Sequence, residues 1–259
     1  MTIKKSFLSF SILIISTYLM AQNDSVKSAV YSWKSVKSEK VDGRDRKHVL
    51  DGNTFDLAEL EIHSSTLEAW QSPHPPHVHE DFEELIIVKE GKLKVIIKDS
   101  TKILGPGGLA LAVAGDKHGF QNASDKPVIY YILKFKPKGS EKNKQGTEAG
   151  SFMKDWTELV TEKTDKGERR SIFDRPTPLF GKLEVHSTSL NAGFASHDPH
   201  THRAEEIILM IKGDVQMQIG RGFYKAEAGD LIFLGSNILH ALKNTGPQQC
   251  SYFAIQWLK

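Results

Sequence analysis

The sequence predicts an all-β protein built from two similar domains, and three observations support this. Short apolar runs alternate with polar residues at a period of two, as in LIIVKEGKLKVII and IILMIKGDVQMQI. These runs end at Gly, Asn, Asp and Pro, the residues that turns favour. The two halves of the chain also repeat each other. Many short strands without a long helical pattern favour a sandwich or a closed barrel, with one short helix as the only candidate, within residues 151–162.

The repeat is visible within the single chain. Residue i of the first half matches residue i+123 of the second, so LEIHSSTL recurs as LEVHSTSL and Trp33 recurs as Trp156. Past a run of three histidines the offset falls to 122, which pairs His118 with His240. Of the 11 histidines, ten fall into five matched pairs, and only His48 stands alone. Duplication of one structural unit explains this pattern.

Composition places the boundary between the two units. The stretch KPKGSEKNKQGTEAGS is charged, contains glycine and has no apolar period, as is typical of an exposed linker. We therefore expect an N-terminal domain over residues 22–138, a linker over 139–155 and a C-terminal domain over 156–259. The two domains can pair with each other, so the expected state is a monomer or a homodimer.

The first 21 residues differ from the rest. Lys4 and Lys5 precede the apolar run FLSFSILIISTYLM, and polar residues follow Ala21. This arrangement is typical of a cleavable secretory signal peptide, because the run is short and close to the N-terminus. An uncleaved anchor is the alternative. We expect cleavage near Ala21, a secreted or periplasmic protein, and no membrane contact after cleavage.

Charge and cysteine content narrow the function classes. Without residues 1–21 the chain has 32 basic and 32 acidic residues, which gives no electrostatic reason to expect nucleic acid or an anionic membrane as partner. A small-molecule substrate is the expected partner. Cys250 is the only cysteine, so we expect a buried thiol and no internal disulfide. Stability then comes from the core, helped by a metal.

Two histidine-rich stretches are the candidate metal sites. HPPHVHEDFEE and HDPHTHRAEE share the pattern H-x-P-H-x-H followed by paired glutamates. Residues two apart on a strand face the same side, so both histidines of each H-x-H can reach one ion. A glutamate from the next strand and a more distant histidine would complete each set. The two sets are His77, His79, Glu84 and His118 in the first half, and His200, His202, Glu206 and His240 in the second.

Mixed imidazole and carboxylate ligands suit a divalent first-row metal, Mn, Fe, Ni, Cu or Zn, with up to one ion per domain. Four protein ligands on a six-coordinate ion leave two positions for water, oxygen or a bidentate substrate. One alternative stays open in the first half. Counting from His79 selects Glu83, whereas counting back from Gly91 selects Glu84. We prefer Glu84, because the strand leading into the hairpin fixes which side it faces.

These stretches resemble the two motifs of the cupin superfamily. HVHEDFEELIIVKEG and HTHRAEEIILMIKG match the first motif, and GDKHGFQN and NILHALKN match the end of the second. The departures concern turns: Asn237 replaces a usual glycine, and Val113 and Gly235 replace a usual proline. The resemblance covers nearly all of the chain after residue 21. It implies a bicupin, with two tandem jelly-roll β-barrels that each enclose a metal.

The resemblance also implies classes of reaction. Two-domain cupins include flavonol-type (quercetinase-like) dioxygenases, oxalate-type decarboxylases and ring-hydroxyl dioxygenases. We predict an exported metalloenzyme that acts on an oxygen-rich small molecule, with dioxygenase chemistry preferred because both halves keep all four ligands. The alternatives are a non-catalytic periplasmic cupin that binds sugars or metal, and a lyase or isomerase acting on acidic sugars.

Four residues are candidates for catalysis. Glu84 and Glu206 could serve as bases, while His74 and His197, three residues before the first ligands, could carry protons at the mouth of each barrel. For both histidines the alternative is an exposed position in a proline-containing loop.

The other repeated pairs have structural expectations. Trp33 and Trp156 are expected to pack an arm of the chain against a barrel. Three pairs are expected at the surface, facing solvent or joined in ion pairs: His63 with His186, Glu83 with Glu205, and Arg46 with Arg169. For His63 and His186 the alternative is a position that lines the pocket.

Overall fold

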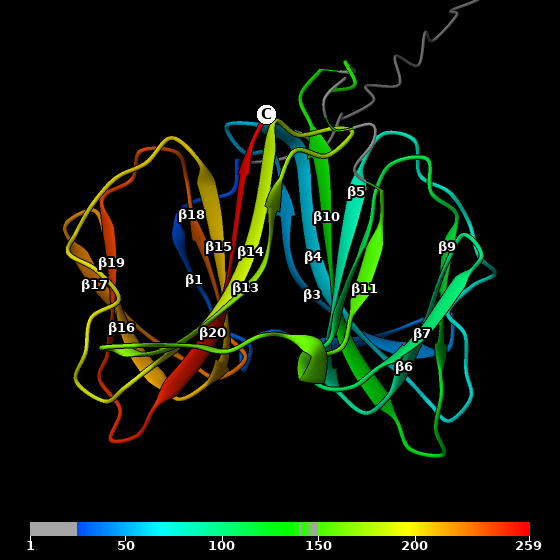
Figure 1. The fold of residues 1–259 in the computed structure, drawn as a ribbon, viewed down its shortest axis with the longest axis horizontal. Coiled ribbons are helices and arrows are strands. Elements are labelled where there is room, and N and C mark those ends of the chain that lie inside the picture. The colour runs from blue at the N-terminus through cyan, green and yellow to red at the C-terminus, as the bar shows by residue number, and fades with distance from the viewer. Residues whose placement is uncertain (1–24, 140, 144–145, 147–149) are drawn as a thin grey trace, which may run out of the picture.

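The computed structural model describes residues 25–139, 141–143, 146 and 150–259. The predicted signal peptide lies outside the described residues. The chain forms two antiparallel β-barrels, each made of a seven-stranded and a three-stranded sheet (Figure 1). The prediction of two tandem all-β barrels is confirmed. Among the described residues, no helix is long and apolar enough to span a bilayer.

The N-terminal barrel has the sheet order β11-β8-β5-β10-β4-β3-β2 opposite β7-β6-β9. The strands of the large sheet are β2 (Ser38–Val41), β3 (Arg44–Gly52), β4 (Leu57–Leu67), β5 (Glu83–Glu90), β8 (Leu109–Ala112), β10 (Val128–Pro137) and β11 (Phe152–Lys154). Those of the small sheet are β6 (Leu93–Ile97), β7 (Ser100–Leu104) and β9 (His118–Asn122).

The C-terminal barrel repeats this order as β1-β18-β15-β20-β14-β13-β12 opposite β17-β16-β19. The strands of the large sheet are β1 (Ala29–Tyr31), β12 (Glu162–Thr164), β13 (Gly167–Arg175), β14 (Lys182–Leu190), β15 (Glu205–Lys212), β18 (Leu231–Leu234) and β20 (Cys250–Leu258). Those of the small sheet are β16 (Asp214–Ile219), β17 (Gly222–Glu227) and β19 (His240–Asn244). Cys250 is fully buried, as predicted.

The two large sheets pack against each other at the centre of the molecule (Figure 1). In strand β5, successive side chains point alternately toward the other barrel and into the barrel's own interior. Leu85 and Ile87 join the apolar cluster shared by both barrels, while Ile86 and Val88 point into their own barrel. Strand β15 repeats this arrangement. Both faces of each large sheet are therefore covered, one by the other barrel and one by the barrel interior.

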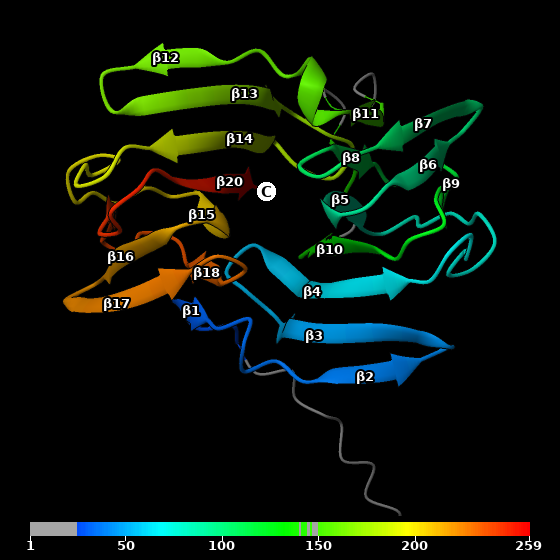
Figure 2. The same cartoon turned by 90° about the horizontal axis from the view of Figure 1, so that it is seen from below.

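The barrels exchange edge strands. Strand β1, near the N-terminus, pairs with β18 of the C-terminal barrel, while β11, within the predicted linker, pairs with β8 of the N-terminal barrel (Figure 2). The tryptophan next to each exchanged strand lies on a glycine of the receiving barrel, Trp33 on Gly229 and Trp156 on Gly107. The prediction that these tryptophans pack an arm against a barrel is confirmed.

The short helix predicted within residues 151–162 is wrong. The segment forms strand β11 and then a single 3₁₀ turn, Trp156–Glu158. Asp155 caps this turn, accepting a hydrogen bond from the backbone N–H of Thr157, and Glu158 closes a capping box. Pairing with β8 satisfies the backbone of residues 152–154, so a longer helix does not form.

Glu205 does not face water, contrary to prediction. It lies on the same side of β15 as Ile207 and Leu209, facing the other barrel, and is 1% exposed. Its carboxylate accepts hydrogen bonds from the Thr54 hydroxyl (2.6 Å) and the Trp257 indole (3.2 Å). The backbone N–H groups of residues 55 and 56 also donate to it, each at 2.9 Å. This carboxylate therefore ties β15 to a turn of the N-terminal barrel.

Glu83 is the counterpart on β5, and it too is fully buried rather than solvated. It accepts a hydrogen bond from the backbone N–H of Leu179, at 3.0 Å, in the matching turn of the C-terminal barrel. Its Oε2 atom has no hydrogen-bond partner among the described residues. The residue paired with Glu83 across the sheet is Phe135, where the other half has Trp257 beside Glu205. The other oxygen of Glu205 accepts from the backbone N–H of Phe55, and the equivalent residue beside Glu83 is Pro178, which has no N–H; this explains the unpaired oxygen.

Candidate metal centres

The first ligand set assembles at one end of the N-terminal barrel. His77 forms a bridge to His118 through two backbone hydrogen bonds of 2.9 Å, which brings a loop residue against strand β9. The ligand nitrogens of His77, His79 and His118 lie within 4.8 Å of one another. Glu84 Oε2 lies 3.5 Å from His79 Nε2 and 3.7 Å from His118 Nε2. The structure thus brings together all four predicted ligands, with Glu84 and not Glu83 beside the histidines.

The second set repeats this frame. His200 and His240 form the same backbone bridge, with hydrogen bonds of 3.1 and 3.0 Å. Glu206 Oε2 lies 3.4 Å from Nε2 of both His202 and His240. His202, Glu206 and His240 have ligand atoms within 4.8 Å of one another, while His200 groups within the same distance of His240 and His197.

The imidazole tautomers fit a cation. Three of the histidines have Nδ1 2.8–2.9 Å from a backbone carbonyl oxygen, which can only accept, so Nδ1 carries the proton and Nε2 offers a lone pair. They are His118, His202 and His240. Their Nε2 atoms are buried and have no hydrogen-bond partner among the described residues. A histidine that binds a metal through one ring nitrogen usually donates the N–H of the other to a carbonyl or carboxylate, and these three histidines have that arrangement.

The carboxylates complete this electrostatic fit. Burial raises the pKa of Glu206, but the two imidazoles beside it outweigh burial and lower the pKa to about 2. Burial also raises the pKa of Glu84, yet its two histidine neighbours hold it well below its usual range. Burial, followed by the charges of nearby histidines, lowers the pKa of His77 to about 4. At neutral pH these groups are two carboxylates and a neutral imidazole, the forms that bind a divalent metal.

A family model described as "Cupin domain" matches residues 66–134 and 187–256, which hold both ligand sets. The chain is a two-domain cupin. A search of curated proteins found no match.

Solved structures share the cupin fold at low sequence identity. AerE from Microcystis aeruginosa is 18% identical, with a TM-score of 0.65, and the match covers 86% of this chain and 97% of that one. Protein Ylba from E. coli is 15% identical, with a TM-score of 0.69 and coverages of 92% and 95%. The oxalate decarboxylase of Lactobacillus farciminis is 14% identical, with a TM-score of 0.68 and coverages of 91% and 87%.

The two cupin barrels enclose different cavities. The N-terminal cavity measures about 160 Å³ and the C-terminal one about 490 Å³, and each is lined by members of its own ligand set. Three pairs of equivalent lining residues contribute to the difference, each with the larger side chain in the N-terminal barrel: Phe120 and Leu242, Ile132 and Ala254, and Lys134 and Gln256. Arg44 also lines the N-terminal cavity, and its equivalent in the other half is Gly167.

His63 and His186 line these cavities, which contradicts the predicted solvent exposure. His63 is 6% exposed. The alternation along β4 does place it on the polar face, but that face looks into the closed barrel. Burial lowers the pKa of both histidines. These histidines are buried because the sheet closes into a barrel. The local alternation of polar and apolar residues does not predict that closure.

The two arginines of the repeat behave differently. Arg46 is partly buried and contacts Glu61 and His63 inside the N-terminal cavity, so its predicted surface position is wrong. Arg169 is exposed and pairs with Glu184 at 3.4 Å, as predicted, although it also borders the C-terminal cavity. Lys134 adds a second cation beside Glu61, at 2.9 Å, and the equivalent Glu184 has Lys182 at 2.8 Å.

His74 and His197 stand at the mouths of the cavities. Each ring packs edge-on against the first ligand of its set, with centroids 4.2 Å apart for His74 and His77 and 4.0 Å apart for His197 and His200. Each also lines its cavity. Both are therefore loop residues that contact the predicted ligand set.

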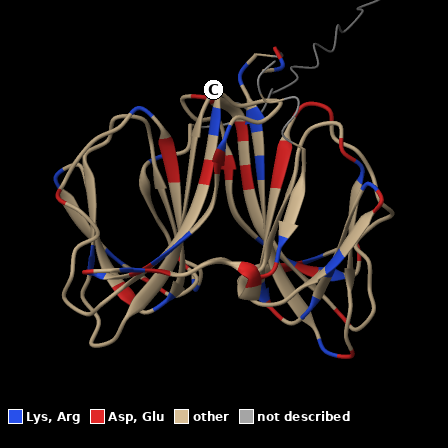
Figure 3. Cartoon of the chain, viewed as in Figure 1, with Lys and Arg blue, Asp and Glu red and all other residues tan. Residues whose placement is uncertain are grey.

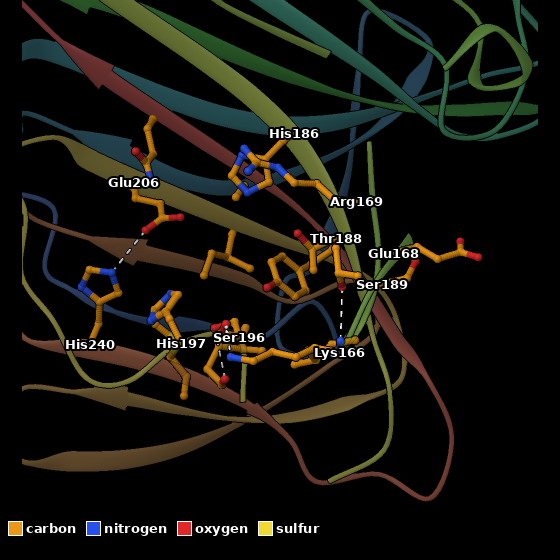
Figure 4. Close-up of a pocket in the computed structure, with 18 of the residues that line it drawn as sticks. Lys166, Glu168, Arg169, His186, Thr188, Ser189, Ser196, His197, Glu206 and His240 are labelled. Carbon is orange, nitrogen blue, oxygen red and sulfur yellow. Dashed lines mark hydrogen bonds and ion pairs between the residues drawn. The ribbon is translucent and has the colours of Figure 1, made fainter. Parts of the chain in front are cut away.

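Sequence reasoning missed two further lining residues of the C-terminal cavity. The Lys166 side chain extends toward Ser196 in the view of Figure 4, and its amine donates to the Ser196 carbonyl at 2.9 Å. Tyr252 lines the wall. For Tyr252, on β20, the available signal was the period of two, which places it on the same face as the lining residues Ala254 and Gln256.

Proposed function

We propose that this cupin is a metal-dependent enzyme of the dioxygenase type that acts on an oxygen-rich small molecule in its C-terminal barrel. The observation that carries the proposal is the cavity of about 490 Å³ bordered by His200, Glu206 and His240. That volume lies within the roughly 300–1,000 Å³ typical of small-molecule sites. The N-terminal cavity of about 160 Å³ lies below that range.

In this proposal His200, His202, Glu206 and His240 hold a divalent first-row metal. The metal would supply Lewis acidity and, if redox-active, oxygen activation. The chain's own contribution is positional. Backbone carbonyls orient the imidazoles of His202 and His240. Burial shields most of the Glu206 side chain from water.

Cationic groups of the cavity favour an anionic or hydroxyl-rich substrate. Arg169 and Lys166 border the cavity, and in the view of Figure 4 His186 lies between Arg169 and Glu206, while the Lys166 side chain extends to Ser196. A guanidinium can donate two parallel hydrogen bonds to a carboxylate or to adjacent oxygens. We propose that these side chains orient the substrate with its reacting oxygens toward the ligand set.

His197 is the proposed proton carrier. Its Nδ1 lies 3.1 Å from the Asp198 carbonyl, which leaves Nε2 free to accept a proton. Burial lowers the pKa of His197, so the ring is neutral at physiological pH and suited to act as a base. Glu206, ionised and in contact with two imidazoles, is the alternative acceptor. His74 and Glu84 are the corresponding groups of the N-terminal barrel.

Metal analysis and oxygen uptake test this proposal together. Protein lacking residues 1–21 is purified, its metals are measured, and a flavonol, a ring diol, oxalate and a uronate are offered under air. Bound Mn, Fe, Ni or Cu with one oxygen molecule consumed per substrate supports dioxygenase chemistry. The double variant H200A/H202A should lose that activity and one metal equivalent. Unchanged activity in this variant would contradict the assignment to the C-terminal barrel.

A lyase, decarboxylase or isomerase acting on an acidic substrate is the second candidate. It is favoured by the cationic residues in both cavities, Arg46 and Lys134 in one and Arg169 and Lys166 in the other. Turnover of oxalate or a uronate without net oxygen uptake would identify it. Bound ligand without turnover would instead indicate a non-catalytic binding protein.

We further propose that the protein is exported and acts as a monomer or homodimer. The apolar segment near the N-terminus supports export, and the packing of the two large sheets within one chain supports a monomer. Cell fractionation and light scattering test these two points.

A further inference from the structure

A third cavity, of about 470 Å³, lies outside both barrels, where the exchanged arms meet the large sheets. It contains none of the candidate metal ligands. The two halves contribute matching residues to it. They are Trp33 and Trp156, Gly107 and Gly229, and Ile87 and Leu209. The internal duplication therefore creates one shared cavity at the junction of the barrels.

The cavity is aromatic on both sides. Trp33 packs edge-on against Tyr131 with ring centroids 5.5 Å apart, and Trp156 packs in the same way against Phe253 at 6.0 Å. Gly107 and Gly229 leave room for the indoles, because a Cβ atom at either position would lie 2.7 or 3.0 Å from an indole carbon. The walls are thus fixed by the contacts that anchor the arms.

At the more exposed rim of this cavity Lys89 and Glu90 have Ile211 and Lys212 as equivalents, and among the buried lining residues one polar group breaks the symmetry. Tyr131 is 4% exposed, and its hydroxyl is buried without a hydrogen-bond partner among the described residues. The equivalent residue of the other half is Phe253, so packing at this position does not require a hydroxyl. Leaving a buried hydroxyl unpaired is unfavourable, and a bound hydrogen-bonding group would remove that cost.

We propose that this cavity binds a flat aromatic small molecule whose hydroxyl or carbonyl group pairs with the Tyr131 hydroxyl. Aromatic walls favour a planar ring system, and the volume is large enough for a bicyclic one. Exposed Ala228 and Ile211 border the cavity and leave a route of entry. The site is independent of the metal centres and of the proposed reaction.

Calorimetric titration with 2-naphthol and with naphthalene tests the proposal. We expect one 2-naphthol per chain, with affinity above that of naphthalene. Tyr131→Phe, which installs the residue of the other half, should weaken 2-naphthol binding about 3- to 10-fold and leave naphthalene binding unchanged. Ala228→Trp, at an exposed position, should block both ligands by filling the entrance.

Two controls keep the outcome decisive. Thermal unfolding shows whether each variant is folded, and H200A/H202A should bind 2-naphthol as the unaltered protein does. The absence of saturable binding, or equal binding in the unaltered protein and in Ala228→Trp, would overturn the proposal. Binding lost only in H200A/H202A would also overturn it, because the ligand would then occupy the C-terminal barrel.

Discussion

The two barrels share one ligand frame but differ threefold in the space beside it, about 160 Å³ against about 490 Å³. The frame depends on backbone bridges and carbonyl-anchored imidazoles, which duplication copied closely. The space depends on side chains that point inward from neighbouring strands, and these have diverged. The two barrels can therefore share the geometry of the metal ligands and still differ in the size of the cavity beside them. The barrel with the larger cavity is the one expected to turn over substrate.

Removing ligands from each barrel in turn gives the largest expected effect. H200A/H202A should lower turnover by more than about 100-fold, because disturbing even the support of a metal ligand costs 10- to 100-fold. H77A/H79A should keep turnover while losing its own metal equivalent. Steady-state rates and metal analysis of both variants check this. The comparison fails if H77A/H79A is the inactive variant.

The buried interdomain carboxylates offer a second comparison. Glu205→Ala removes the acceptor of four hydrogen-bond donors. Glu83→Ala removes the acceptor of fewer donors, among them the backbone N–H of Leu179. We expect Glu205→Ala to lower the free energy of unfolding by about 3–5 kcal/mol and Glu83→Ala by about 1–3 kcal/mol. Urea denaturation of both variants measures the difference. Equal losses of unfolding free energy in the two variants would show that the number of hydrogen-bond donors does not determine how much each carboxylate stabilises the interface.

Glu83 also predicts a pH dependence of stability. Burial raises the pKa of Glu83 from 4.5 to about 7, so the folded state binds this proton more tightly than the unfolded state. The resulting stabilisation is complete below pH 4.5 and is lost as pH rises through 7, a change of about 3 kcal/mol. The stability difference between the unaltered protein and Glu83→Gln should shift by this amount between pH 4 and pH 8.

Replacing the neighbour of Glu83 sharpens this test. Phe135→Trp places an indole where the other half has Trp257, which donates a hydrogen bond to the equivalent carboxylate. A new donor favours the ionised carboxylate, so the pH-dependent loss should shrink. An unchanged pH profile in this variant would show that the indole does not reach the carboxylate.

The ligand frame could be predicted from sequence because its residues recur at fixed spacing and the strand period sets their facing. Glu84 and Glu206 share a face with the inward residues of β5 and β15, and the structure places them beside the histidines. The neighbouring Glu83 and Glu205 were misassigned, because a charged residue in an apolar strand usually faces water. Here the second face is covered by the other barrel, a tertiary contact that local pattern does not contain.

The strand exchange had no local signal either. Strands β1 and β11 are three residues long, and β1 pairs with β18 about two hundred residues away in sequence. The difference in cavity size, by contrast, was present in the repeat itself. Phe120 is larger than Leu242 and Ile132 is larger than Ala254, so once the strands place these residues inside the barrels, the N-terminal cavity is expected to be the smaller one.

Transplanting side chains between the barrels tests whether the cavity determines activity. Ala254→Ile together with Leu242→Phe gives the C-terminal barrel two side chains that the N-terminal barrel already accommodates. Metal content should not change, because neither residue is a candidate ligand, while KM for the substrate should rise about 10-fold or more as the cavity narrows. Phe120→Leu in the N-terminal barrel is the matched control and should leave KM unaltered. If the narrowed barrel keeps its KM, substrate binds outside this cavity, and the difference between the barrels concerns packing rather than function.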